Sequence, residues 1–160
     1  MIIVSDTSPI TYLVLTGYID TLPALFGEII VPKAVYQELL HAKAPAVVKE
    51  WVNSKPSWFT VHEVVNLFSA EELGVGEQEA ISLAVYLKAN LFLCDDMAAR
   101  QFARRQNLLV LGTLGILEEA AKQNRLNLQE AVQKLTATSC RLRADVVREA
   151  LMRDEKRREG

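Results

Sequence analysis

Short, continuous apolar runs recur along this chain, and they constrain its fold more than any other feature. The clearest are residues 2–4, 28–31, 91–94 and 108–111, and a weaker one lies at 59–64. Their apolar residues are consecutive rather than alternating, which is typical of parallel strands covered on both faces. The runs therefore predict the buried strands of a parallel sheet.

The stretches between these runs carry helical patterns. Pro32 suits the first position of a helix that reaches about Leu40, and Glu77 opens a strong amphipathic helix that reaches Leu87. Further helices are expected over 10–16, 46–54, 97–106, 113–123, a segment capped by Asn127, and the charged segment after about Arg141. Alternating strands and helices predict an α/β fold with right-handed crossovers.

Composition and length narrow the class of protein. With 160 residues, half of them hydrophobic, we expect a single domain over 1–160 that ends in a C-terminal helix and charged tail from about residue 141. No apolar run approaches the ~20 residues of a membrane span, and the N-terminus lacks the pattern of a signal peptide. Cys94 and Cys140 have no paired spacing, so we expect reducing cytoplasm. The net charge of −2 means that a nucleic acid would need a local basic patch.

Acidic residues stand where the predicted strands end or helices begin. Asp6 follows the first strand, and Asp95 and Asp96 follow the third strong run. Glu38 lies two turns into its helix, and Glu77 lies in the first turn of another. Ligands of open α/β sheets bind outside the carboxyl ends of the strands, so these carboxylates are expected to converge there.

Convergent carboxylates repel one another unless a cation lies between them. Oxygen-only ligands favour Mg²⁺ or Mn²⁺ over zinc, and such ions promote phosphodiester hydrolysis. Each residue also has a structural interpretation: Asp6 and one of Asp95 and Asp96 can cap helices, Glu38 can be a solvated helix residue, and the helix dipole favours Glu77. The joint placement favours a metal site.

Two basic residues are candidates for phosphate contacts. Arg100 lies one turn after Asp96 and Lys33 opens the helix that carries Glu38. Arg100 can meet a phosphate oxygen, or it can form a surface pair with Asp96 that contributes little energy.

Three motifs resemble the PIN domain family, which includes the VapC toxin ribonucleases. They are IIVSDTSPI, PKAVYQEL, and the block GEQEAISLA…LFLCDD, and the resemblance covers roughly residues 1–120. Asp6 matches the first acid of the family, in its D-T-N/S motif. Glu38 matches the second, within Pro32–Leu39. Glu77 and Asp95 match the last two acids, which usually lie eighteen positions apart.

The chain departs from typical VapC proteins at two places. Glu stands where Asp is usual for the third acid, so Glu79 competes with Glu77, and the doublet makes Asp96 an alternative to Asp95. The stretch GTLGILEEA at 112–120 is similar to an uncharacterised branch of the family.

The resemblance implies a three-layer α/β/α sandwich around a parallel sheet of four to five strands. It also implies dependence on Mg²⁺ or Mn²⁺, cleavage of RNA, homodimers, and a small antitoxin partner if the chain is a toxin. Thr7 and Ser8, beside Asp6, join Arg100 and Lys33 as expected nucleic-acid contacts. The alternative is a PIN scaffold that binds RNA or a protein without cleaving.

Overall fold

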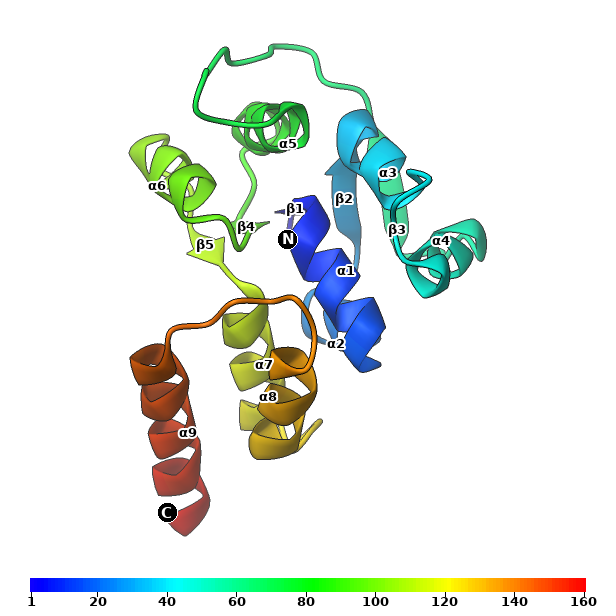
Figure 1. Cartoon of the computed structure of the whole chain (residues 1–160). Coiled ribbons are helices and arrows are strands. Elements are labelled where there is room, and N and C mark those ends of the chain that lie inside the picture. The colour runs from blue at the N-terminus through cyan, green and yellow to red at the C-terminus, as the bar shows by residue number, and fades with distance from the viewer.

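The computed structural model describes residues 1–160 and contains one five-stranded sheet flanked by helices (Figure 1). The strands are β1 (Ile3–Ser5), β2 (Ile29–Pro32), β3 (Phe59–His62), β4 (Leu91–Leu93) and β5 (Val110–Leu111). The helices are α1 (Thr7–Thr16), α2 (Thr21–Phe26), α3 (Lys33–Leu39), α4 (Ala46–Asn53), α5 (Val75–Tyr86), α6 (Met97–Arg105), α7 (Thr113–Lys122), α8 (Leu128–Thr136) and α9 (Ala144–Glu159).

All neighbouring strands pair in parallel, in the order β3-β2-β1-β4-β5. Val4 of β1 pairs with Ile30 on one side and with Phe92 on the other. The chain winds outward from β1 to β3, returns to the centre at β4, and then winds outward in the opposite direction. The reversal between β1 and β4 leaves a crevice at their carboxyl ends, where open α/β sheets bind ligands.

Helices cover both faces of the sheet. Helix α5 packs on β1, β2 and β4, and α6 packs on β5. Helix α2 contacts β2, and α7 packs against both α1 and α2. Figure 1 shows α5 and α6 on one side of the strands and α1, α2 and α7 on the other. The predicted α/β sandwich with a parallel sheet is confirmed.

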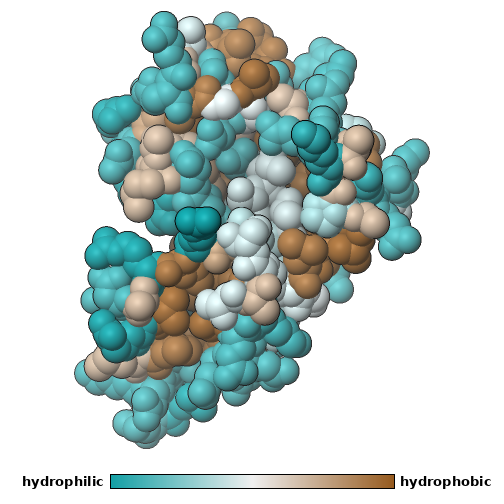
Figure 2. Space-filling view, in the orientation of Figure 1, coloured by the Kyte–Doolittle hydropathy of each residue, from teal (hydrophilic) through white to brown (hydrophobic).

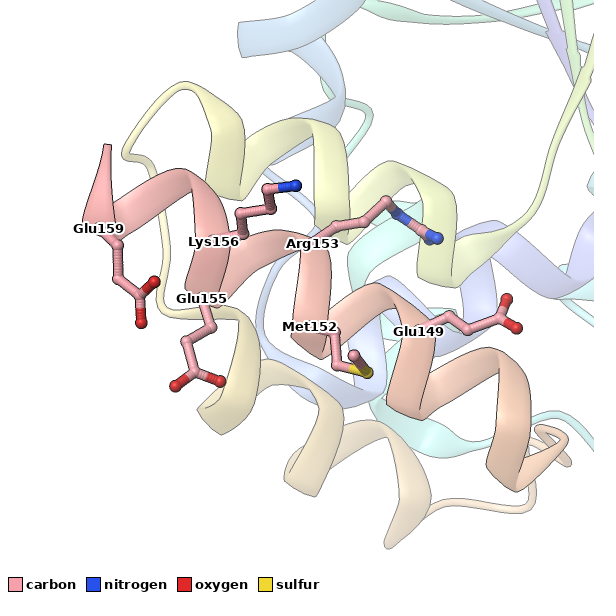
Figure 3. Close-up of a pocket in the computed structure, with 6 residues that line it drawn as sticks. All are labelled: Glu149, Met152, Arg153, Glu155, Lys156 and Glu159. Carbon is pink, nitrogen blue, oxygen red and sulfur yellow. The ribbon is translucent and has the colours of Figure 1, made fainter.

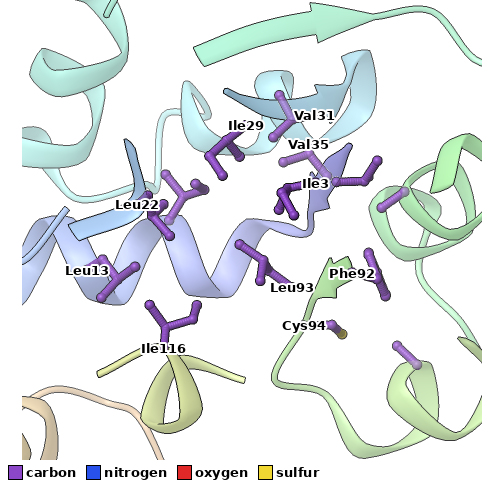
Figure 4. Packing of buried hydrophobic residues seen from close by; sticks show 14 of the residues in the cluster. Ile3, Leu13, Leu22, Ile29, Val31, Val35, Phe92, Leu93, Cys94 and Ile116 are labelled. Atoms are coloured by element: carbon purple, nitrogen blue, oxygen red, sulfur yellow. The ribbon is translucent and has the colours of Figure 1, made fainter. Parts of the chain in front are cut away.

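The core fixes the strand ends in place. Ile3, Phe92 and Leu93 of the sheet are completely buried, as are Leu13 of α1 and Ile116 of α7. These side chains meet between the strands and the covering helices (Figure 4). Burial of each contributes about 1.5–3 kcal/mol. The residues that follow β1 and β4 are therefore held by the most rigid part of the molecule.

Two elements of the structure were predicted weakly or not at all from the sequence. The first four residues of the weaker run at 59–64 form strand β3, Phe59–His62, and each of them pairs with a residue of β2. Helix α2 was not predicted: it has only six residues with Pro23 among them, and its contacts with β2 and α7 support it. None of the helices combines the length and hydrophobicity that crossing a membrane requires.

Candidate metal centre

Asp6 lies at the end of β1, beside the end of β4. Its backbone N–H donates to the carbonyl of Leu93 across 2.9 Å, and its side chain is only 4% exposed. Asp6 occupies the N-cap position of α1, but its carboxylate makes no capping bond. Burial, followed by the charges of Glu77 and Glu38, raises the pKa of Asp6 from 3.8 to about 7. A carboxyl group in these surroundings gains from a nearby cation.

Glu38 reaches the same place from α3. The hydroxyl of Thr7, which follows Asp6, donates a hydrogen bond to the Glu38 carboxylate. That carboxylate also lies against Gly76, where an added Cβ would stand 2.8 Å from Cδ of Glu38. Thr7 and Gly76 together direct an otherwise exposed side chain toward the end of β1.

Glu77 and Asp96 complete the group from the starts of α5 and α6. Glu77 Oε1 accepts a hydrogen bond from the N–H of Gly74 at 2.9 Å, in a capping arrangement. Burial, followed by the charges of Asp96 and Glu38, raises the pKa of Glu77. The carboxylate of Asp96 caps α6 by accepting from the N–H of Ala99 at 2.9 Å. We call Asp6, Glu38, Glu77 and Asp96 the acidic cluster.

Asp95 has its partners outside this cluster. Its two carboxylate oxygens accept hydrogen bonds from the N–H and the hydroxyl of Thr113, each at 2.7 Å. Burial raises the pKa of Asp95, while Thr113 and the charge of Arg100 lower it. Within the doublet, therefore, Asp96 faces Glu77, and Asp95 joins the β4–α6 turn to the start of α7.

The remaining residues predicted to bind metal or nucleic acid, Glu79, Lys33 and Ser8, lie in two parts of the structure. Glu79 accepts a hydrogen bond from the N–H of Ala34 at 3.1 Å and, with Lys33, lines a hollow of about 270 Å³ beside residues 63–67. Ser8 is partly buried in the first turn of α1, two residues after Asp6. The structure therefore gives Glu79 a partner on α3 rather than in the acidic cluster.

Arg100 takes a different partner from the one that its spacing suggests. It forms no ion pair with Asp96; instead its charge acts on Asp95, and its Nη1 lies close to Gly112. Its Nε atom is buried without a hydrogen-bond partner. The guanidinium group thus lies on the α7 side of the β4–α6 turn.

The donor set of the acidic cluster suits a hard divalent cation. All four side chains offer carboxylate oxygens, and none of them forms an ion pair with Lys or Arg. No group of three or more His, Cys, Asp or Glu side chains stands close enough together to hold a metal ion. The chemistry fits Mg²⁺ or Mn²⁺, and binding requires these side chains to draw together.

A family model places the chain among known proteins. The model described as "DUF3368: PIN domain" matches residues 2–156. The chain belongs to the PIN domain family. PIN domains are typically nucleases and usually depend on a metal.

A solved structure supports the fold of this PIN domain. A PilT N-terminus domain protein from the hyperthermophilic archaeon Sulfolobus solfataricus P2 is similar, with a TM-score of 0.52 and 12% identity. The match covers 89% of this chain and 100% of that one. At this identity the likeness shows the fold alone. No curated protein matches the chain significantly.

A hollow elsewhere in this PIN domain shares no residue with the acidic cluster. Its volume is about 610 Å³, and it runs along α9 (Figure 3). Figure 3 shows that its lining residues are Glu149, Met152, Arg153, Glu155, Lys156 and Glu159. This surface mixes both signs of charge on one helix. We therefore identify the candidate metal centre from the gathered carboxylates and not from the volume of a hollow.

Sequence reasoning missed three residues that shape the centre. The sequence indicated no role for Cys94 beyond a free thiol, but its Sγ lies 3.7 Å from Oδ2 of Asp6, and burial raises the pKa of its thiol, which keeps it a donor. Gly76 gives Glu38 its space, and Thr113 holds Asp95. The only sequence clue to the role of Gly76 was its position at the start of a predicted helix, where glycine is not a favoured residue. Nothing local pointed to Thr113.

Proposed function

We propose that this PIN domain is a metal-dependent endoribonuclease whose centre is the acidic cluster. The observation that carries the proposal is the gathering of four carboxylates from four separate segments, without a cationic side chain to neutralise them, at the crevice between β1 and β4. A structural role for these acids would be served better by ion pairs or full solvation. Carboxylates that a rigid sheet edge holds near one another repel, and a bound cation would remove that repulsion.

The four acids contribute in different ways. Asp6 is fixed by β1 and buried, so it supplies the least mobile oxygen ligand. Glu77 and Asp96 come from helix starts, where their backbone hydrogen bonds set their positions. Glu38 is exposed, as Asp96 is, and depends on Thr7 for its orientation. Small movements of Glu38 and Asp96 would tighten the cluster around an ion.

The reaction proposed here is hydrolysis of an RNA phosphodiester. A bound Mg²⁺ or Mn²⁺ would supply an activated water and offset the charge of the phosphate. Arg100, one turn into α6, offers guanidinium donors that fit the oxygens of another phosphate of the same strand. Thr7 and Ser8 add hydroxyl groups beside Asp6 for contacts with the strand.

Purified protein, free of any partner, tests this proposal. We expect it to cleave a pool of structured RNAs in millimolar Mn²⁺ and to stop when EDTA is added. A complete lack of cleavage across several RNAs and both metals would overturn the proposal.

A second candidate is a PIN scaffold that binds RNA without cutting it. The observation in its favour is that no three of the acids stand close enough together to hold a metal ion. Binding of labelled RNA that is unchanged by Mn²⁺, with no cleavage products, would support this second function.

A further inference from the structure

A cavity of about 340 Å³ lies between α6, the start of α7 and the segment that joins α8 to α9. Figure 2 shows an indentation between the C-terminal helix and the upper part of the molecule, with strongly hydrophilic side chains at its borders. Fourteen residues line the cavity, six of them hydrophobic, and its charged residues are four arginines and two acids, namely Arg100, Arg141, Arg143, Arg153, Asp95 and Glu118. We call it the arginine pocket.

Both acids of the arginine pocket already accept hydrogen bonds from other side chains of the protein. Glu118 accepts two hydrogen bonds from Arg153, at 2.8 and 3.1 Å. The carboxylate of Asp95 is held by Thr113. The lining therefore carries more positive than negative charge, although the charges of Asp95 and Arg100 act on each other.

Two of the arginines are available to a ligand. Arg143 pairs with Asp145 at 2.8 Å, outside the pocket lining. Arg100 and Arg141 form no ion pair, and Nε of Arg100 is buried without a hydrogen-bond partner. A buried donor without a partner is costly, so the guanidinium group of Arg100 keeps unused hydrogen-bonding capacity beside the pocket.

Gly112 keeps the Arg100 guanidinium in this pocket. An added Cβ at Gly112 would lie 2.7 Å from Nη1 of Arg100, so a larger residue there would push the guanidinium away. Gly112 also precedes the first turn of α7, whose N-terminus carries partial positive charge. The cavity, its free arginines and this close approach together describe a built anion site.

We propose that the arginine pocket binds a phosphate group of an RNA strand, at a position other than the phosphate that is cut. The inference rests on the proposed function, because its ligand is the proposed substrate. Asp95 lines the pocket and the next residue, Asp96, belongs to the acidic cluster. An RNA strand with one of its phosphates in the pocket would thus pass the acidic cluster. The guanidinium groups would offset the repulsion between the RNA phosphates and the carboxylates.

Replacement of the most exposed free arginine tests the pocket. Arg141→Gln removes one positive charge from a surface segment, so the fold is expected to remain intact. Arg125→Gln is the matched control, because Arg125 follows the opposite end of α7 and does not line the pocket. Gly112→Ala is a second variant, which removes no charge: its added Cβ would lie 2.7 Å from Nη1 of Arg100 and 3.0 Å from Oδ1 of Asp95, so both side chains would have to shift.

The measurement is affinity for a fluorescein-labelled oligoribonucleotide with a 5′-hydroxyl, in EDTA, over a series of salt concentrations. We expect Arg141→Gln to weaken binding about fivefold at 0.1 M salt and to lower the salt slope by about 0.7, the share of one phosphate contact on a single strand. Gly112→Ala should weaken binding in the same direction, and Arg125→Gln should leave affinity within about twofold of wild type.

The outcomes separate this inference from the proposed function. Equal binding by wild type, Arg141→Gln and Gly112→Ala, or no RNA binding at all, would overturn the pocket, and cleavage by wild type would still uphold the nuclease. Dependence on Arg141 in a protein that cuts nothing would uphold the pocket and overturn the nuclease. If adenosine 5′-monophosphate bound with the same dependence on Arg141 while RNA did not, the ligand would be a free nucleotide and the proposal would be wrong.

Discussion

The carboxylate of Glu38 occupies the space above Gly76 that any other residue would fill with its Cβ. A Cβ at position 76 would stand 2.8 Å from Cδ and 3.0 Å from Oε2 of Glu38. Glycine at the start of α5 therefore allows a side chain of α3 to reach the acidic cluster. The relationship joins two segments that are far apart in sequence.

Gly76→Ala should displace Glu38 and leave the fold intact. The group that must move is the end of a flexible, exposed side chain, and alanine suits a helix better than glycine by about 1 kcal/mol. We therefore expect unchanged or slightly higher thermal stability in EDTA, together with weaker Mn²⁺ binding and slower RNA cleavage. Denaturation curves and a Mn²⁺ titration provide the measurement.

Gly74→Ala is the control for this change. It lies in the same turn, but its added Cβ would meet Oε1 of Glu77 at 3.4 Å, an ordinary contact. Equal effects of the two alanines on Mn²⁺ binding would contradict a specific role of Gly76 in placing Glu38.

Asp95 and Asp96 should respond differently to substitution. Asp96→Asn should keep the helix cap, because Asn caps as well as Asp, and should weaken Mn²⁺ binding and cleavage. Asp95→Ala removes both acceptors from the buried Thr113 and should cost about 1–3 kcal/mol of unfolding free energy, with a smaller effect on Mn²⁺ binding. Urea denaturation and Mn²⁺ titration of both variants provide the measurement. The reverse pattern would assign the metal ligand to Asp95.

The strands of the sheet could be predicted from the sequence, but the choice between Asp95 and Asp96 could not. Continuous apolar runs mark strands wherever both faces are covered, so β1, β2, β4 and β5 could be located from residue types alone. The choice between Asp95 and Asp96 depends on Thr113, eighteen residues further on, and on the turn that brings α7 beside β4. Helix α2 was hidden because tertiary contacts, rather than its short sequence, support it.

The stability of the metal-free protein should fall as the pH rises through the acidic range. The pKa of Asp6 is raised from 3.8 to about 7, so between these values the folded chain keeps a proton that the unfolded chain has released. The free energy of unfolding should then decrease with pH, by at most ~1.4 kcal/mol per pH unit from this group. Urea denaturation in EDTA at pH 5 and pH 7 measures the change. Asp6→Asn should show a smaller decrease, and an equal decrease in both proteins would contradict the assignment.

Mn²⁺ should stabilise the folded protein. An ion that binds only the native cluster adds about 1.4 kcal/mol at ten times its dissociation constant, which corresponds to a rise of about 3–6 °C in Tm for a chain of this size. Thermal melts with Mn²⁺ and with EDTA measure the shift. Wild type should show it and Asp6→Asn should lose most of it. A rise of the same size in both proteins would place the bound ion elsewhere.

The comparison of Asp6→Asn with Asp20→Asn in RNA cleavage tests the central claim most directly. Both changes replace one carboxylate by an amide, but Asp20 is an exposed residue before α2 whose side chain caps nothing. In Mn²⁺, we expect Asp20→Asn to cut a labelled RNA at the wild-type rate. Asp6→Asn should be slower by about a thousandfold or more, with an unchanged circular dichroism spectrum. Cleavage by Asp6→Asn at the wild-type rate would contradict a catalytic centre at the end of β1.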